Sequence, residues 1–385
     1  MSLGEFALIL AIGLAGPILA VPRRLGIPVA VGEILLGVAV GRTGTGWINP
    51  SDPVLSFLAS AGFALVMLVA GSHVPLRDAA LRHALRRGGL LAAATGALAV
   101  PAGYGVAALA GTDHALLYAV LFASSSAALV MPVIDDEHLD SSPILATIVH
   151  VTIADTACII LLPLVEEPAR AGAAALGVLA VLGAGAVLYL VTRWLQSTGA
   201  LARMHKLSRR RNFGLELRVQ LIALFALAGL AQQLGVSVML AGFACGLSLA
   251  AQGEPRRLAR QLFAVNDGFL GPVFFVWLGA SLDLRALAEQ PRMIALAGAL
   301  ALGALTVHAA ARLLGQPLPL AILAGAQLGV PVAAVTIGTH NNLLSSGEGG
   351  AIMAAALVSV ATTSIAAAFA ARAQNRGQEP AAGSV

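Results

Sequence analysis

A single acid stands in the middle of an apolar segment, because Asp155 lies deep within residues 142–165, which we expect to be helical. No arginine or lysine lies in this segment. Burial without a basic partner disfavours the charged form of a carboxyl group. Asp155 is therefore expected either to hold a proton or to bind a metal cation, with the hydroxyl of Thr152 one helical turn away. The alternative is a neutral acid that hydrogen-bonds a neighbouring helix.

Few other ionisable groups fall within apolar segments, and such groups are candidates for function because they are costly to bury in a membrane. Glu33 is expected to cap or bridge to a neighbouring helix. His150 is expected to be a core histidine with satisfied hydrogen bonds, and His308 either the same or a proton relay. Asp267 lies near the start of another apolar segment.

Two apolar segments contain helix-weakening residues. Ser124, Ser125 and Ser126 interrupt one, and the stretch 325–331, which contains Gln327 and Pro331, interrupts the other. Serine, glycine and proline free backbone groups, which are tolerated in a membrane only where they line a cavity or meet protein. Interruptions at matching places in two halves indicate a transporter binding site. We therefore expect the three serines to supply oxygen ligands to a cation at Asp155, and Gln327 and Pro331, with Glu33 and His308, to act in the second shell or in gating.

The composition defines what must position these residues. Of the 385 residues, 58% are hydrophobic and 11% are charged, and the mean hydropathy is +0.87. Water-soluble domains carry about a quarter charged residues, so a soluble enzyme and a disordered chain are both excluded. The sequence predicts an all-α polytopic membrane protein with about 13 transmembrane helices. The expected helices are 4–22, 27–42, 54–71, 88–111, 114–134, 142–165, 170–195, 213–233, 236–251, 260–281, 291–314, 317–339 and 348–371.

The matching interruptions divide the chain into two halves. We expect a first repeat over 1–165, a linker helix over 170–195, a second repeat over 213–372 and a disordered cytoplasmic tail over 373–385. With the N-terminus outside and the C-terminus cytoplasmic, all but four of the 23 basic residues fall on the inside. The four exceptions are Arg42, Arg170, Arg285 and Arg292. This distribution predicts a multi-pass protein of the inner or plasma membrane, and the basic loops report topology and not nucleic-acid binding.

Three motifs carry a resemblance to a known family. They are residues 24–37 with Gly41 (RLGIP and VGEILLG), residues 234–247 (LGVS and LAGFACGL) and residues 274–284 (FFVWLGASLDL). Together they resemble the monovalent cation:proton antiporter-2 family, of the Kef and NapA type, over nearly the whole chain. The resemblance implies two inverted repeats with crossed, broken helices, a homodimer, and Asp155 as the residue that exchanges ion and proton.

The sequence departs from that family in its charges. Ala154 stands where the family has an acid or amide before the aspartate, and the only lysine, Lys206, lies in a loop instead of on the eleventh helix. One titrating acid predicts exchange of one Na⁺ or K⁺ for one proton without net charge movement. No cofactor is expected beyond the transported ions, and the lipid bilayer and a second copy are the expected partners. The alternatives are an organic-solute carrier on the same fold, a non-transporting sensor or partner subunit, and a potassium efflux system whose regulatory subunit is a separate chain.

Overall fold

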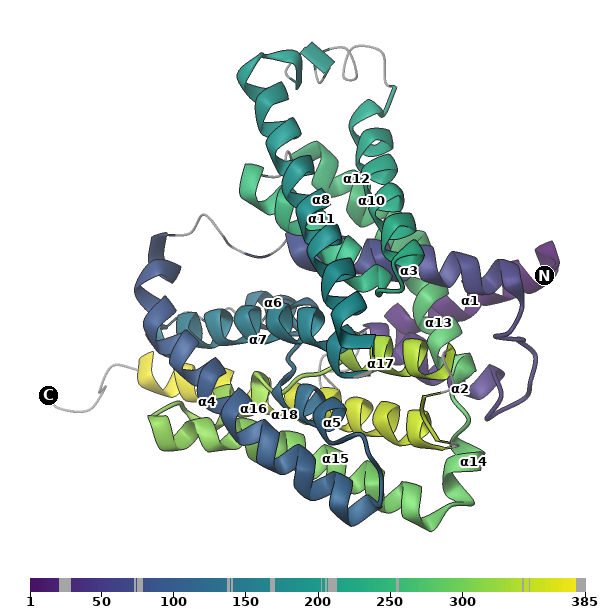
Figure 1. The fold of residues 1–385 in the computed structure, drawn as a ribbon, viewed down its shortest axis with the longest axis vertical. Helices are drawn as coiled ribbons and strands as arrows, with labels where there is room; N and C mark the ends of the chain where they lie inside the picture. Colours follow the sequence, from purple (N-terminus) through teal and green to yellow (C-terminus); the bar gives the residue numbers. More distant parts are fainter. Residues whose placement is uncertain are drawn as a thin grey trace, which may run out of the picture. The chain divides into compact units, whose positions relative to one another are not determined.

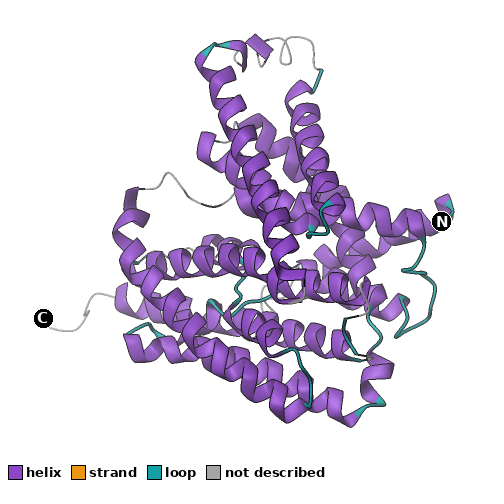
Figure 2. Cartoon of the chain, in the orientation of Figure 1, coloured by secondary structure: helices purple, strands orange, loops and turns teal. Residues whose placement is uncertain are grey.

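The computed structural model describes residues 1–20, 29–72, 74, 79–136, 139, 141–166, 170–201, 203–204, 206, 213–253, 256–340, 343–345 and 347–378. Regular structure in these ranges is entirely helical, with no strand (Figure 2). Helices satisfy their backbone hydrogen bonds internally, which a chain surrounded by hydrocarbon requires. The predicted all-α class is therefore confirmed.

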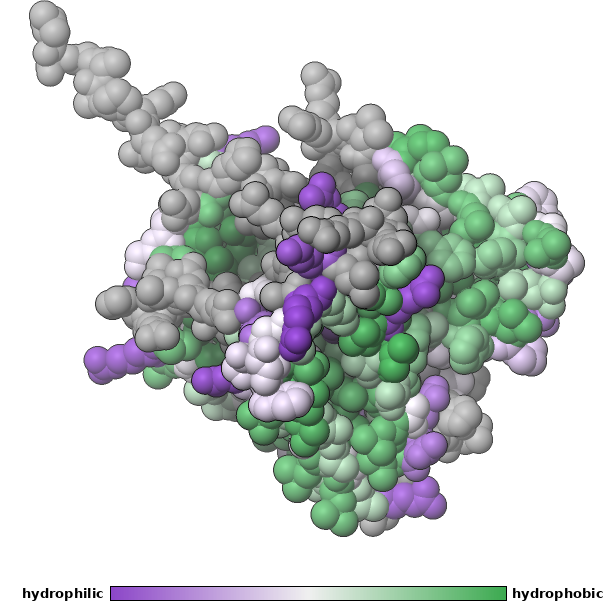
Figure 3. Space-filling model, turned by 90° about the horizontal axis from the view of Figure 1, so that it is seen from above, coloured by the Kyte–Doolittle hydropathy of each residue, from purple (hydrophilic) through white to green (hydrophobic). Residues whose placement is uncertain are grey.

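Eight helices of the described residues are long and apolar enough to cross a membrane, and several shorter apolar helices accompany them. Large apolar side chains also cover much of the surface (Figure 3). Along α8 (Ala171–Ser197), for example, Leu176, Leu179 and Trp194 are all more than 60% exposed. Such a surface suits lipid and not water. The exact number of thirteen transmembrane helices stays a prediction.

The contacts between helices group the chain into two compact units. Unit 1 holds the helices α1 (Leu3–Ala20), α2 (Val29–Val40), α3 (Pro53–Ser72), α8, α10 (Leu215–Gln233), α11 (Val238–Gln252), α12 (Arg256–Val265), the π-helical turn η2 (Asn266–Leu270) and α13 (Gly271–Ser281). The expected tenth helix is therefore three consecutive pieces, and Asp267 lies in the π-helical turn.

Glycines allow two pairs of helices in unit 1 to pack with their backbones in contact. Helix α11 packs on α3, where a Cβ atom added at Gly246 would lie 2.8 Å from the Cα atom of Gly71. Helix α13 packs on α2, where a Cβ atom at Gly279 would collide with the backbone of Ile34. Close approach of this kind is how membrane helices gain van der Waals contact when lipid supplies no hydrophobic driving force.

Unit 2 holds Asp155 and all the other site residues predicted from the sequence except Glu33. Its elements are α4 (Ala79–Ala110), α5 (Ala115–Ala123), α6 (Ala127–Asp136), most of α7 (Ser142–Glu166), α14 (Leu284–Ala288), α15 (Pro291–Ala309), the 3-10 helix η3 (Ala310–Leu314), α16 (Leu318–Leu323), α17 (Gly329–His340) and α18 (Glu348–Gln378). Helices α4, α5, α15 and α18 lie side by side (Figure 1). The two units each draw on both predicted repeats, so the assignment of the repeats stays a prediction.

Both predicted interruptions are present in unit 2. The chain leaves helical geometry at Ser124, Ser125 and Ser126, between α5 and α6, and again between α16 and α17 over residues 324–328. Pro331 does not lie in the second break but in the first turn of α17. A proline is accommodated there because the first N–H groups of a helix have no partner inside it.

The end of the chain differs from the expectation. Helix α18 continues to Gln378, six residues into the segment 373–385 that was predicted to be disordered. Residues 379–385 of the predicted tail lie outside the described residues, as do the basic residues 209–211 and Arg23, Arg24 and Arg77.

We expect Gly246→Ala to destabilise the protein, because the added methyl group would collide with the backbone of α3. Overpacking of this kind costs about 1–3 kcal/mol. The matched control is Gly183→Ala in α8, where an added Cβ atom meets nothing within 4 Å. Alanine is the better helix former by about 1 kcal/mol, so the control should be unchanged or more stable. Thermal unfolding in detergent measures both, and equal midpoints for the two variants would contradict the packing described above.

Candidate functional site

Asp155 lies on α7, is 6% exposed, and faces the first break. Its Oδ2 atom accepts a hydrogen bond of 3.0 Å from the backbone N–H of Ala127, the first residue of α6. The N-terminus of a helix carries partial positive charge and free N–H groups, so it favours an anion. The N-terminus of α6 therefore stabilises the charged form of the Asp155 carboxylate.

The described residues contain no basic side chain paired with Asp155. Ion pairs in the described ranges include those of Met1 with Asp52 and of His114 with Glu348, and the Ala127 N–H is the one donor to Asp155 within these ranges. One turn earlier on α7, the Oγ1 atom of Thr152 is buried and has no hydrogen-bond partner among these residues. A carboxylate has about four lone-pair positions, so most of those on Asp155 stay available to a proton or a cation.

The three serines of the first break connect it to the second break. Ser124 Oγ donates to Leu121 O at 2.8 Å, and Ser125 Oγ donates to Ala324 O, at the end of α16, at 2.5 Å. Ser126 directly precedes α6, and its carbonyl oxygen accepts a hydrogen bond of 3.0 Å from the N–H of Val130. The serine hydroxyls that donate these bonds keep lone pairs, and their role as cation ligands stays a prediction.

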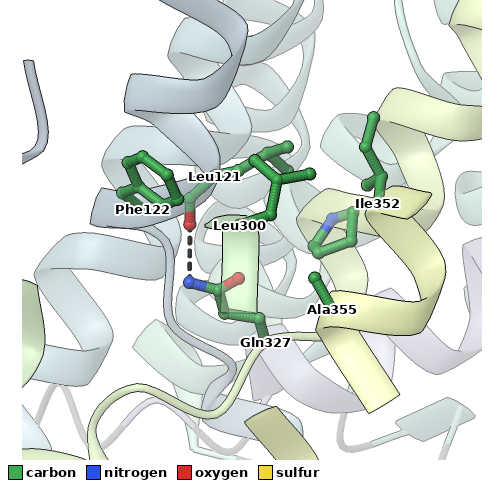
Figure 4. A pocket seen from close by; sticks show the side chains of 7 residues that line it. Leu121, Phe122, Leu300, Gln327, Ile352 and Ala355 are labelled. Atoms are coloured by element: carbon green, nitrogen blue, oxygen red, sulfur yellow. Dashed lines mark hydrogen bonds between the residues drawn. The ribbon is translucent and has the colours of Figure 1, made fainter. Parts of the chain in front are cut away.

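Gln327 comes from the second break and binds the first. Its Nε2 atom donates to Leu121 O at 2.6 Å and to Ser124 O at 3.4 Å, and Figure 4 shows the amide turned toward the Leu121 carbonyl. Its backbone N–H donates to Ser359 Oγ on α18 at 3.0 Å. A small pocket lies beside this contact, between α5, α15, α17 and α18, and Pro331 helps to line it. Gln327 therefore joins the two breaks and Pro331 lines the pocket beside them, while their roles in gating stay predictions.

His308 reaches the same carbonyl from α15, since its Nε2 atom lies 3.1 Å from Ser124 O. The ring of His150 on α7 stacks on that of His308, with centroids 5.6 Å apart and planes 22° apart. Both residues are buried, as predicted. The expectation of satisfied hydrogen bonds is met only in part, because His308 Nε2 is bonded to Ser124 O while His150 Nε2 and His308 Nδ1 have no partner in the described part of the chain.

Glu33 belongs to unit 1, and therefore to a different compact unit from Asp155. It is 3% exposed and lies against α1, where a Cβ atom at Gly16 would lie 3.3 Å from its Cδ atom. Its expected role as a cap or bridge to a neighbouring helix stays a prediction.

Glu348 is a buried acid that the sequence reasoning missed. Glu348 at the start of α18 is 0% exposed, and four donors bind its carboxylate. His114 Nδ1 and Tyr118 Oη contact Oε1 at 2.6 and 2.7 Å, and the N–H and hydroxyl of Ser345 contact Oε2 at 3.0 and 2.8 Å. All four lone-pair positions are thus occupied. Only the position of Glu348 ahead of an apolar run could have signalled it.

Known proteins resemble the whole chain. The family described as "Sodium/hydrogen exchanger, transmembrane" matches residues 7–372. YjbQ of Bacillus subtilis (strain 168), which carries the provisional name Na(+)/H(+) antiporter, is 25% identical over 94% of this chain and 62% of its own length. The glutathione-regulated potassium-efflux system protein KefC of Salmonella typhi is 28% identical over 80% of this chain and 50% of its own length. The chain thus spans about half to three fifths of these curated relatives.

One solved structure shares the fold. The sodium proton antiporter MjNhaP1 from Methanocaldococcus jannaschii superimposes with a TM-score of 0.61 over 97% of both chains, at 16% identity. At so low an identity the likeness shows the fold alone, which is that of a sodium proton antiporter.

The contact between His114 and Glu348 predicts a pH-dependent stability. The hydrogen bond to the Glu348 carboxylate raises the pKa of His114 above its ordinary 6.5. The stabilisation is then complete below pH 6.5 and is lost as the pH rises through the raised pKa. We expect His114→Gln to lower the free energy of unfolding by roughly 1 kcal/mol at pH 6. This value is reduced because the ring is partly exposed to solvent. At pH 9 the loss in free energy of unfolding should be smaller.

Tyr118→Phe is the matched control, because it removes a donor to the same carboxylate that does not titrate between pH 6 and 9. Its thermal unfolding midpoint should fall by a similar amount at both pH values. If the unfolding midpoint of His114→Gln lay below that of the wild type by the same amount at both pH values, the imidazole would not be charged in this contact.

Proposed function

Because the chain belongs to the sodium/hydrogen exchanger family, a family of transporters and not of enzymes, we propose that it exchanges a monovalent cation, Na⁺ or K⁺, for protons across a lipid bilayer at Asp155. The observation that carries the proposal is the state of this carboxylate. It is buried, a helix N-terminus favours its negative charge, and no basic side chain in the described ranges pairs with it.

A proton and a monovalent cation cannot occupy Asp155 at the same time. A proton neutralises Asp155, and a neutral carboxylic acid lacks the negative charge that would hold a cation in a buried site. When the proton leaves, the carboxylate and nearby oxygens form a hard-ion shell of the kind that alkali cations need. Thr152 Oγ1, which lacks a partner in the described chain, and the hydroxyls of Ser124, Ser125 and Ser126 are the ligands we assign. Asp155 is thus both the proton carrier and the metal ligand of the transported ion.

One titrating acid fixes the stoichiometry. Asp155 moves one proton or one monovalent cation, so the exchange carries no net charge. Ala154, which can neither ionise nor donate a hydrogen bond, precedes it. Alternating access follows if Asp155 opens to one side of the membrane at a time, and the two broken helices that meet beside it supply the irregular backbone for such a change.

The membrane setting follows from the charges. We propose the inner or plasma membrane, an external N-terminus and a cytoplasmic C-terminus, because this orientation puts most basic loops inside. We also propose a homodimer. The name of KefC describes a glutathione-regulated system, and a regulatory subunit on a separate chain would be compatible with the present sequence.

The test is cation-driven proton flux in proteoliposomes. We expect Na⁺ or K⁺ gradients to drive proton movement at a rate that does not change with the membrane potential. Asp155→Asn should abolish this flux, because the amide can neither release a proton nor hold a cation by charge. The matched control is Thr156→Val, the neighbouring residue, whose hydroxyl bonds only Thr152 O within its own helix.

Several results would contradict the proposal. Flux in a folded Asp155→Asn protein would remove the residue from the mechanism, and a strong voltage dependence would exclude one-for-one exchange. Flux that requires an organic ion would favour the organic-solute carrier. Absence of flux in the wild type for every cation would favour a non-transporting sensor or partner subunit.

A further inference from the structure

We propose that His308 is a positioning residue for the exchange: its neutral ring holds the Ser124 carbonyl and thereby keeps the Ala127 N–H directed at Asp155. The inference rests on the proposed function and adds a residue to it. A break in a buried helix leaves carbonyl groups that must find hydrogen-bond donors elsewhere.

The donors at the first break come from three places. The end of α5 supplies the N–H and hydroxyl of Ser124, which both bind Leu121 O. Gln327 supplies an amide to Leu121 O at 2.6 Å. For Ser124 O the shorter contact is His308 Nε2 at 3.1 Å, and the Gln327 amide is more distant at 3.4 Å. His308 is therefore the principal side-chain donor to this carbonyl.

The geometry fixes the state of the His308 ring. A carbonyl oxygen only accepts hydrogen bonds, so Nε2 must carry the hydrogen and donate it. Nδ1 is buried without a partner in the described chain, and no acidic side chain is among the recorded contacts of the ring. A charged ring would be a buried cation without a counter-ion, which is strongly unfavourable. His308 therefore acts as a neutral donor.

Packing holds the ring in place on two sides. His150 stacks on it from α7, the helix that carries Asp155. Gly325 of the second break lies against it, so that a Cβ atom there would be 3.3 Å from His308 Cγ. Helix α15 is itself pressed against α5, since a Cβ atom at Gly303 would lie 2.6 Å from Phe122 Cζ. The ring thus has little freedom to leave the Ser124 carbonyl.

The link from His308 to Asp155 is short. Ala127 lies three positions after Ser124, and the Ala127 N–H makes the hydrogen bond to Asp155. A donor to a carboxylate favours its charged form. If Ser124 is released, the start of α6 can shift and this hydrogen bond weakens. Asp155 then binds its proton more tightly, and the cation competes less well.

The test compares two substitutions at one position. Glutamine can present a neutral N–H near the place of Nε2, whereas alanine cannot. We expect His308→Ala to raise the KM for the cation about two- to tenfold, the range of one hydrogen bond, and to shift the pH profile of flux toward alkaline pH. His308→Gln should restore both toward the wild type. Thr306→Val on the same helix is the control, because its hydroxyl bonds only carbonyls of α15.

A second measurement does not need transport. Amide hydrogen exchange of the segment 124–127 should be faster in His308→Ala than in the wild type, and should return to the slow rate in His308→Gln. An unchanged KM and pH profile in His308→Ala would overturn the proposal. Equal losses in both variants with a lowered unfolding midpoint would also overturn it, because they would mean that only the volume of the ring matters. If the wild type shows no flux at all, the proposed function fails, and the exchange rates alone decide the role of His308.

Discussion

The compact unit that contains Asp155 depends on how two interrupted helices satisfy their backbone groups. A helix that stops inside a membrane protein leaves carbonyls at one end and N–H groups at the other, and neither can be left unpaired in an apolar surrounding. In unit 2 the carbonyls near the end of α5 receive donors from Gln327 and His308, and the first N–H of α6 receives the Asp155 carboxylate. The chemistry at Asp155 is therefore a consequence of the break itself.

The two ends of the first break, the end of α5 and the start of α6, have partners of different charge. Neutral donors bind the carbonyls, so no fixed positive charge stands at the end of α5, and the negative charge stands alone at the start of α6. A lysine or arginine at the end of α5 would also satisfy these carbonyl groups, but its positive charge would neutralise Asp155 by Coulomb attraction. The absence of a basic side chain from these described contacts leaves neutralisation of Asp155 to a mobile ion. That is the physical reason for proposing a one-for-one exchange.

The sequence indicated the parts of this arrangement but not their connections. Composition predicted helices in a membrane, and the serines at 124–126 and the glycines near Gln327 predicted both breaks, because these residues weaken a helix wherever it lies. The tertiary partners were not predictable. Ser125 and Ala324 are 199 positions apart, and Gln327 and Leu121 are 206 apart. No periodicity relates such pairs. The unpartnered nitrogens of His150 and His308 were missed for the same reason, since a hydropathy pattern shows that a side chain is buried and not what it faces.

A comparison of two buried acids explains why Asp155 and not Glu348 is assigned the exchange. Asp155 binds the first N–H of α6 and Glu348 is the first residue of α18, and both acids are almost wholly buried. Glu348 accepts four hydrogen bonds, which fill its lone-pair positions and hold it in place, so that an incoming cation would have to displace donors of which one is an imidazole. Asp155 accepts one hydrogen bond from the described residues, and that donor is a backbone amide that cannot move without α6. An acid whose charge is favoured by a fixed donor, and whose remaining lone pairs are free, can change occupants without unfolding its surroundings. Burial alone therefore does not identify an exchanging carboxylate, whereas the number and type of its donors do.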